Sequence, residues 1–75
     1  MKQTEAVHKA FGLRIRMMRE ALGITQDELA KRVGLTRTSV VNGESGRQRY
    51  SLEDVDLYAK AFGTTPKHML KGIYT

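Results

Sequence analysis

The sequence predicts an all-α fold of five helices in a single domain that covers residues 1–75. Apolar residues recur every three or four positions along most of the chain, the spacing that places them on one face of a helix. Residues that cap helix N-termini and glycines that end helices separate these stretches. A chain of 75 residues is long enough for one small core. Folding of a chain of this size buries about 60% of the surface that the unfolded chain exposes.

The first helix is expected over residues 4–22, and Gly23 ends it. Apolar side chains at positions i, i+4, i+7 and i+11 form a stripe that faces the core: Phe11, Ile15, Met18 and Leu22. Leu13 and Met17 lie on the opposite side of the helix. They are either isolated surface residues, which are common, or a contact with a partner subunit.

The second helix is expected over residues 25–33. Thr25 and Glu28 form a capping box, in which each side chain binds a backbone N–H at the start of the helix. The inward face consists of small and apolar residues: Leu29, Ala30 and Val33. Gly34 ends the helix because glycine adopts the left-handed conformation without steric cost.

A third helix is expected over residues 36–44, directly after this turn. Thr36 is its N-cap and Val40 points inward. The outward residues form the surface that we call the recognition face: Arg37, Thr38, Val41 and Asn42. Two helices joined by so short a turn cross closely, which requires a small residue at the crossing, here Ala30, and a glycine in the turn. Residues 25–44 are therefore predicted to form a helix-turn-helix.

This stretch resembles the helix-turn-helix of the Cro and phage-repressor family. The segments TQDELA, VGLTRTSV and ESGR stand at the family's spacing, and the likeness extends from about Phe11 to Leu70. The resemblance implies a five-helix, lambda-repressor-like domain whose recognition face contacts DNA bases. It also implies an ion pair between Arg19 and Glu44, which joins the first helix to the third and holds the arginine near a phosphate.

The recognition face has side chains that suit base contacts. Arginine pairs with the O6 and N7 atoms of guanine, asparagine with N6 and N7 of adenine, and the methyl groups of valine and threonine with the thymine methyl. Phosphate contacts are expected beside this face. Gln26 lies at the start of the second helix, where exposed backbone N–H groups bind anions. Thr36 and Ser39 would add hydroxyl contacts, or would serve only as a cap and a hydroxyl on the helix surface.

The glycine-rich segment 43–50 follows the recognition helix and carries further donors: Arg47, Gln48 and Arg49. Arginine and glutamine side chains in such a loop can meet phosphate oxygens, and the alternative is an ordinary solvated basic loop. Gly43 departs from the family, whose members usually have a large apolar residue there to close the core. Either the helix ends near Asn42, or another side chain, Met18 or Tyr50, fills the space.

The fourth helix is expected over residues 51–62, with Ser51 as its N-cap and Gly63 after it. Its first turn carries acidic residues, which suit the helix dipole and are not catalytic: Glu53, Asp54 and Asp56. The inward stripe consists of Val55, Tyr58, Ala59 and Phe62, with Leu52 at its edge.

The fifth helix is expected over residues 66–71, because Thr65 and Pro66 form an N-cap followed by proline at the first helical position. In related phage repressors, the region after the fourth helix makes the subunit contact. The resemblance therefore implies a symmetric dimer interface with apolar candidates from this part of the chain: Leu57, Met69, Ile73 and Tyr74.

The composition favours a polyanionic partner. Lys and Arg number 13 against 8 acidic residues, which leaves a net charge of +5. The chain has no cysteine, so disulfides and thiolate metal sites are excluded, as suits a reducing cytoplasm. No apolar run is as long as a membrane span, which needs about 20 residues, and no signal-peptide pattern is present. We therefore expect a cytoplasmic, nucleoid-associated protein.

The sequence indicates binding rather than catalysis. His8 and His68 lie far apart and are expected to be solvated surface residues, so neither a metal nor another cofactor is expected. No nucleophile motif or phosphate-binding loop occurs, and an enzyme is therefore not expected.

The predicted function is that of a homodimeric repressor, in which residues 36–42 of each subunit enter successive major grooves of a pseudo-palindromic operator in double-stranded DNA. A controller-type activator of a restriction-modification operon has the same architecture. A further alternative is an antitoxin, whose main partner is a toxin protein and whose DNA binding is autoregulatory. A non-DNA adaptor is disfavoured by the arginines around the recognition helix.

Overall fold

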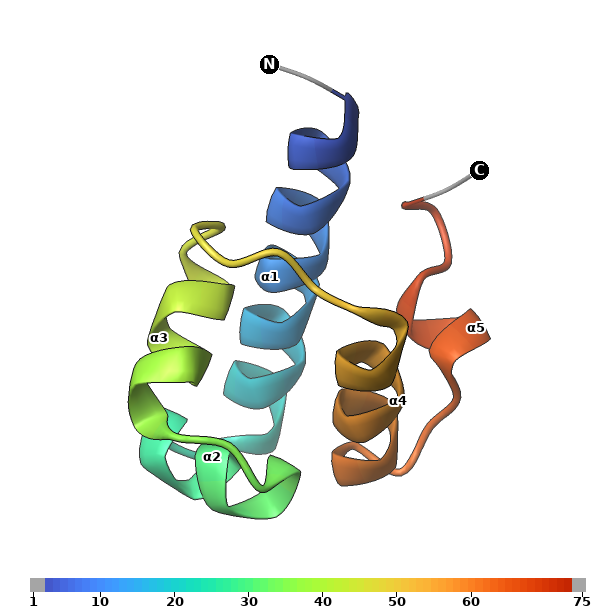
Figure 1. The fold of residues 1–75 in the computed structure, drawn as a ribbon. Helices are drawn as coiled ribbons and strands as arrows, with labels where there is room; N and C mark the ends of the chain where they lie inside the picture. Colours follow the sequence, from blue (N-terminus) through green and yellow to red (C-terminus); the bar gives the residue numbers. More distant parts are fainter. Residues whose placement is uncertain (1–2, 74–75) are drawn as a thin grey trace.

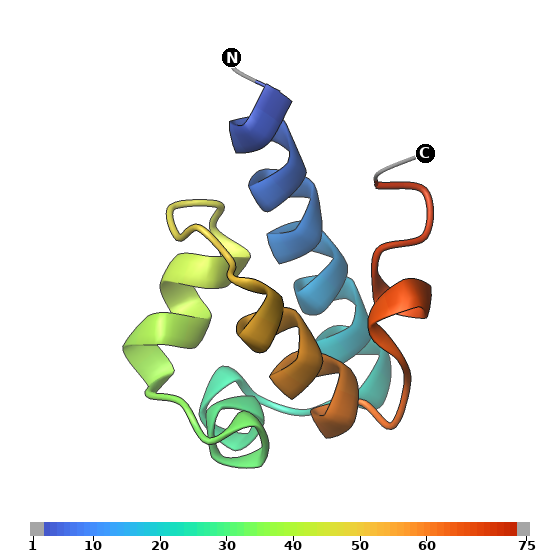
Figure 2. The ribbon, with the colours of Figure 1, turned by 45° about the vertical axis from the view of Figure 1, so that its right-hand side comes forward.

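The structure is a computed structural model and describes residues 3–73. In this range, five helices surround one core. They are α1 (Gln3–Leu22), α2 (Gln26–Val33), α3 (Arg37–Glu44), α4 (Leu52–Ala61) and α5 (Pro66–Met69), and no strand occurs in this range. α3 lies along α1, α2 closes the lower end of the bundle and contacts both α3 and α4, and α5 packs on the outer side of α4 (Figure 1 and Figure 2). None of these described helices is long and apolar enough to cross a membrane.

Side-chain caps begin four of the helices, at the positions that the sequence predicts. The hydroxyls of the N-caps accept hydrogen bonds from the backbone N–H three residues later in each case: Thr25, Thr36, Ser51 and Thr65. Thr25 and Ser51 both form complete capping boxes, with Glu28 and Asp54 as the return partners. These bonds satisfy donors that a helix start otherwise leaves without partners, so the local sequence determines where each helix begins.

α5 ends at Met69, before the predicted end at residue 71. Arg14 explains the early end, because it donates from Nη1 to the Met69 carbonyl at 3.0 Å and from Nη2 to the Lys71 carbonyl at 2.8 Å. The Met69 carbonyl therefore accepts a hydrogen bond from a side chain of α1 at the residue where α5 ends. Gly72, at φ +81°, then turns the backbone away.

The core is built from the stripes that the sequence predicts, with two exceptions. Leu22 is 52% exposed and Leu52 is 86% exposed, so neither is a core residue. Leu22 lies in the last turn of α1, and Gly23, at φ +69°, turns the chain so that Ile24 is buried instead. Leu52 occupies the first turn of α4, next to the exposed N-cap. Leu13 and Met17 are both more than half exposed, as their place off the stripe predicts.

Tyr50 fills the space that Gly43 leaves beneath α3. The helix does not end near Asn42 but continues to Glu44, and a Cβ at position 43 would overlap the Tyr50 hydroxyl and lie 3.1 Å from its Cζ. The ring packs edge-on against Phe11, with ring centroids 4.6 Å apart. α1 also approaches closely here, because a Cβ on Gly12 would overlap the Gly43 carbonyl oxygen. Gly12 thus lets the backbones of α1 and α3 meet, and Gly43 leaves room for the Tyr50 side chain, which closes the space beneath α3.

Candidate nucleic-acid interface

The recognition face lies on the outside of α3. Val40, on the opposite side of the helix, is fully buried, while Arg37 and Thr38 are exposed and Val41 and Asn42 are half-buried. The N-cap Thr36 holds the start of the helix, and the Ser45 hydroxyl donates to the Asn42 carbonyl at 2.9 Å near its end. A rigid helix therefore presents a guanidinium, an amide and methyl groups on one surface.

A network around Glu44 fixes the orientation of α3. The predicted ion pair is present: Arg19 donates from Nε to Glu44 Oε2 at 2.7 Å and from Nη2 to Oε1 at 3.0 Å. Arg19 also donates from Nη1 to the Ile24 carbonyl at 2.9 Å. The side chains of Arg19 and Glu44 are only 13% and 4% exposed, and the hydrogen bond to Glu44 raises the pKa of Arg19. The network thus locks α1 to α3 by a bidentate, charge-assisted contact.

Gln26 belongs to the same network, which the sequence did not indicate. Its Nε2 donates to Glu44 Oε1 at 3.2 Å, so the start of α2 is tied to the end of α3. One amide hydrogen of Gln26 remains for a phosphate, as do the backbone N–H groups of the first turn of α2 that the Thr25 cap leaves free. Arg19 likewise keeps one hydrogen on each Nη atom.

Thr36 and Ser39 have structural roles in this arrangement. The Thr36 hydroxyl accepts from the Ser39 backbone N–H at 3.1 Å and donates to Ser39 Oγ at 3.0 Å. The cap interpretation of Thr36 is therefore correct, and only the Ser39 hydroxyl keeps a hydrogen to donate. Arg47 and Arg49 are exposed in the loop after α3, and Gln48 is half-buried beside them.

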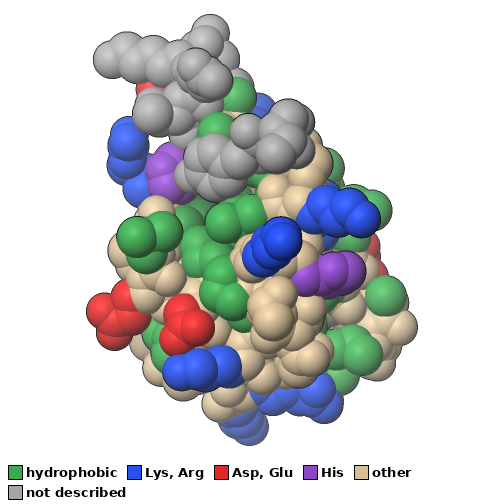
Figure 3. Space-filling model, turned by 90° about the vertical axis from the view of Figure 1, so that its right-hand side faces the viewer, with side chains coloured by type: hydrophobic (Ala, Val, Ile, Leu, Met, Phe, Trp, Pro, Cys, Tyr) green, Lys and Arg blue, Asp and Glu red, His purple; other side chains and the backbone are tan. Residues whose placement is uncertain are grey.

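The surface of α4 and α5 carries the candidates for a subunit contact. Figure 3 shows this side of the molecule, where hydrophobic side chains gather between charged ones. Leu57 and Ile73 are partly buried here, whereas Met69 is fully buried in the core. Met69 is therefore not an interface residue: Thr65 and Pro66 start α5 so that this side chain points inward. Tyr74 lies outside the described residues.

His8 differs from its prediction as a solvated residue. It is half-buried, its Nδ1 accepts a hydrogen bond from the Tyr50 backbone N–H at 2.8 Å, and its ring lies parallel to the Tyr50 ring with centroids 6.2 Å apart. No local pattern points to this contact, because the two residues are distant in sequence. His68 is exposed, and residues 3–73 contain no group of His, Asp and Glu side chains that could hold a metal ion.

Comparison with known proteins places this interface in context. A family model described as a helix-turn-helix domain matches residues 10–70. An uncharacterized HTH-type transcriptional regulator of Methanothermobacter thermautotrophicus is 47% identical over 49 residues, which cover 65% of this chain and 71% of that protein. The control protein C.BamHI of Bacillus amyloliquefaciens is 31% identical over 68 residues, covering 89% of this chain and 84% of the relative.

Two solved structures show the same arrangement of helices. The restriction-modification controller protein C.AhdI from Aeromonas hydrophila has a TM-score of 0.76 and 35% identity, covering 84% of this chain and 94% of that one. The DNA-binding domain of the P22 c2 repressor has a TM-score of 0.76 and 31% identity, covering 87% of this chain and 86% of that one.

Proposed function

This chain belongs to the helix-turn-helix domain family, and we propose that it binds operator DNA as a homodimer and represses transcription. The predicted likeness to Cro and phage-repressor proteins and the lambda-repressor-like fold are confirmed by these matches. A DNA-binding transcriptional regulator is the function that the matches support. Repression, dimerisation and the symmetry of the operator are our proposals.

The observation that carries the proposal is the fixed orientation of the recognition face. The network of Arg19, Gln26 and Glu44 joins three helices, so the orientation of the recognition face is already fixed in the free protein. Little conformational entropy is therefore lost on binding DNA. Arg37 is suited to a guanine and Asn42 to an adenine, while Thr38 and Val41 offer methyl groups to thymine. These four residues are the proposed base contacts.

Phosphate contacts are proposed around the recognition face. The donors come from α1, the first turn of α2, α3 and the loop after it: Arg19, Gln26, Ser39, Arg47, Gln48 and Arg49. Thr36 is proposed here only as the cap that positions Ser39, because its hydroxyl hydrogen is donated to Ser39 Oγ. Of the donors, Arg47 and Arg49 have exposed side chains on a loop that directly follows the recognition helix. Such contacts set the position of the protein on the duplex and contribute affinity without sequence preference.

The proposed dimer uses the surface of α4 and α5. Leu57 and Ile73 are only partly buried in one subunit, and the symmetric use of such a surface would place two recognition helices on half-sites about 10 base pairs apart. A regulator of this kind acts on the nucleoid in the cytoplasm and works by occupancy of DNA, without catalysis. Tyr74 remains a predicted interface residue.

A controller protein of a restriction-modification operon is the second candidate function. Two of the similar proteins, C.BamHI and C.AhdI, are described as control or controller proteins. The fold and the recognition face serve an activator as well as a repressor, because the position of the operator relative to the promoter decides the sign of regulation. The antitoxin alternative stays a prediction, which co-purification with the product of a neighbouring gene would test.

Two arginine variants test the proposed division between base and phosphate contacts. Arg37→Ala should cost about 1–3 kcal/mol of binding free energy on the operator and relax the preference at one base pair. Arg49→Ala should weaken operator and random DNA alike and lower the salt dependence of binding by about one counterion. The measurement is Kd against salt concentration for both duplexes, with Arg32→Ala in the exposed last turn of α2 as control. Equal losses on both duplexes for Arg37→Ala would remove Arg37 from the base contacts.

A further inference from the structure

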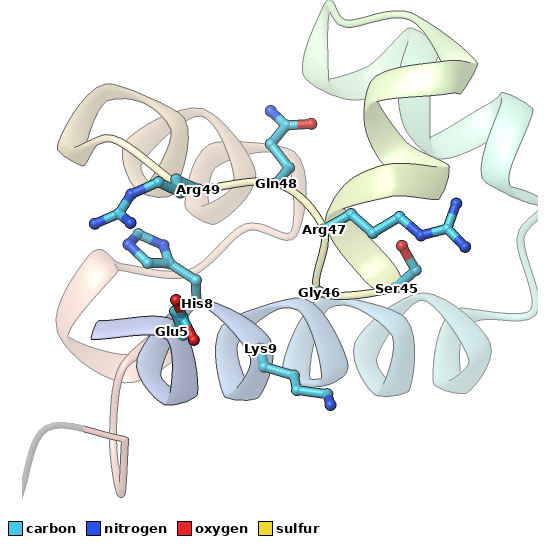
Figure 4. Close-up of a pocket in the computed structure, with 8 residues that line it drawn as sticks. All are labelled: Glu5, His8, Lys9, Ser45, Gly46, Arg47, Gln48 and Arg49. Carbon is cyan, nitrogen blue, oxygen red and sulfur yellow. The ribbon is translucent and has the colours of Figure 1, made fainter. Parts of the chain in front are cut away.

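A pocket of about 360 Å³ lies between the N-terminal half of α1 and the loop after α3, outside the helix-turn-helix (Figure 4). We call it the loop pocket, and its charged and polar lining comes from two segments: Glu5, His8 and Lys9 on α1, and Ser45, Arg47, Gln48 and Arg49 on the loop. Basic groups outnumber the one carboxylate. The pocket is therefore an electropositive hollow with donors on both walls.

His8 contributes a fixed donor to the loop pocket. Because its Nδ1 accepts the hydrogen bond from the Tyr50 N–H at 2.8 Å, the neutral ring carries its hydrogen on Nε2. The imidazole of His8 on α1 and the side chain of Arg49 on the loop both line this pocket (Figure 4). Two donor groups from different segments thus converge, an arrangement that suits an anion with several acceptor oxygens.

Gly46 sets the shape of the pocket floor. A Cβ at this position would lie 2.9 Å from Lys9 Cγ, and the backbone has φ +81°, so the loop rests directly on the stem of Lys9. The aliphatic part of Lys9 packs against the loop, and its exposed side chain points away from His8 and Arg49 in Figure 4. The loop and α1 therefore pack together into one continuous surface.

The loop pocket continues a row of hollows beside α3. One hollow is lined by Arg19, Gln26 and Arg37, among others, and a second by Arg16, Arg19, Gln26 and Ser45. Arg19 and Gln26 join these two, and Ser45 joins the second to the loop pocket. The row thus begins at the proposed phosphate contacts of α2 and ends at His8 and Lys9.

We propose that the loop pocket binds a phosphate group, namely a backbone phosphate of duplex DNA beyond those reached by the helix-turn-helix. His8 Nε2 and the Arg49 guanidinium donate hydrogen bonds to it, and Lys9 adds charge. The assignment to DNA rests on the proposed function, because the row of hollows follows the helix that reads the bases. α1 would then extend the interface along the duplex.

Two variants separate this site from the rest of the interface. His8→Asn keeps an oxygen that can accept the Tyr50 N–H but removes the donor on the pocket side, and Lys9→Gln keeps the stem that packs on Gly46 but removes the charge. We expect about a tenfold weaker Kd for His8→Asn on any duplex, and a salt slope lower by about one counterion for Lys9→Gln. Arg32→Gln, which changes an exposed cation in the last turn of α2 outside all proposed contacts, is the control and should change Kd little beyond its effect on net charge.

A second experiment uses inorganic phosphate with the full chain and follows the side-chain NMR signals of His8 and Arg49. Saturable shifts that are lost in His8→Asn support the site even if that variant alone alters DNA binding. Shifts with unchanged DNA binding in both variants would overturn the assignment to DNA and identify free phosphate as the ligand. No shifts together with unchanged DNA binding would overturn the site.

The failure of the proposed function would look different. If the wild-type chain bound no duplex at all, DNA binding itself would be refuted, and the phosphate titration would still decide on the loop pocket. Lys9→Gln keeps the proposal testable if His8→Asn fails to fold, since Lys9 has no hydrogen bond to another described residue that folding would lose.

Discussion

Residue 43 shows how a missing side chain is replaced from elsewhere in the chain. Gly43 leaves a space beneath the recognition helix, and the ring of Tyr50 occupies it from the loop that follows. The Tyr50 hydroxyl is buried and has no hydrogen-bond partner among the described residues. An unpaired buried hydroxyl is unfavourable. At this position the ring therefore fills the space well, but the hydroxyl loses its hydrogen bonds to water.

Substitution of these two residues should be strongly non-additive. Gly43→Ala should destabilise the fold by about 1–2 kcal/mol, because the new Cβ overlaps the Tyr50 hydroxyl and this outweighs the gain in helix propensity. In a Tyr50→Phe background the overlap with the hydroxyl is removed and only the 3.1 Å approach to Cζ remains, so the same change should cost clearly less. Chemical denaturation of the wild type, both single variants and the double variant measures the coupling. Additive free energies would show that Tyr50 does not fill this space.

Burial of two tyrosines makes the fold sensitive to alkaline pH. Burial raises the pKa of Tyr50 and raises that of Tyr58 to about 12, above the usual value of 10.0. Above pH 10 the unfolded chain loses these phenolic protons while the folded chain keeps them, so the free energy of unfolding falls as pH rises.

The expected fall is about 1 kcal/mol per pH unit for each tyrosine, and for Tyr58 it extends up to about pH 12. Urea denaturation between pH 8 and pH 11 measures it. Tyr58→Phe should show a shallower decline than the wild type, because only Tyr50 then contributes. An unchanged slope in this variant would contradict the role given to burial.

At the scale of the elements, the network around Glu44 joins α1, α2 and α3. Glu44→Gln keeps the shape of the side chain but leaves the Arg19 guanidinium without its countercharge at a site where it is only 13% exposed. Removal of one partner from such a pair should cost about 3 kcal/mol of folding stability. The matched control is Glu20→Gln, because Glu20 pairs with Arg16 at 3.6 Å on an open helix surface. That change should cost less than about 0.5 kcal/mol.

Thermal and urea unfolding of both variants measure this difference in stability. The Kd for the operator shows whether α3 keeps the orientation needed for DNA binding. We expect Glu44→Gln to lose DNA affinity as well as stability, and Glu20→Gln to lose neither. A stability loss in Glu44→Gln no larger than that of Glu20→Gln would mean that the network does not hold the helices together.

Helix starts could be predicted from the sequence, whereas some helix faces could not. Thr25, Thr36, Ser51 and Thr65 act within three residues of themselves, so local sequence is sufficient to place them. Burial of a side chain near a helix end depends on what packs there from distant segments. The predictions for Leu22, Leu52 and Met69 were wrong for this reason.

In the whole molecule and its interface, too, features set by local sequence could be predicted, whereas contacts between distant segments could not. The Arg19–Glu44 pair was expected because the motif repeats a family pattern, and the outward residues of α3 follow from helix periodicity. Three contacts lay beyond prediction: Gln26 with Glu44, His8 with Tyr50, and Arg14 with α5. Each joins segments that no local pattern connects, and the row of hollows along α3 exists only because α1 and the loop are brought together in the fold.

The domain as a whole is a small basic body with a net charge of +5 and all proposed DNA contacts on α1, α2, α3 and the following loop. The surface of α4 and α5 is thereby left for a second subunit. If the recognition faces of two symmetric subunits read the bases, the target site must be an inverted repeat.

Selection of bound duplexes from a random DNA pool by the purified protein, followed by sequencing, reveals the form of the target site. We predict enrichment of an inverted repeat with half-site centres about 10 base pairs apart, and a change of preference at one position of each half-site when Arg37→Ala is selected in parallel. Retention of DNA that depends on salt but shows no enriched sequence would contradict base reading. Enrichment of a single half-site without a repeat would contradict the symmetric dimer.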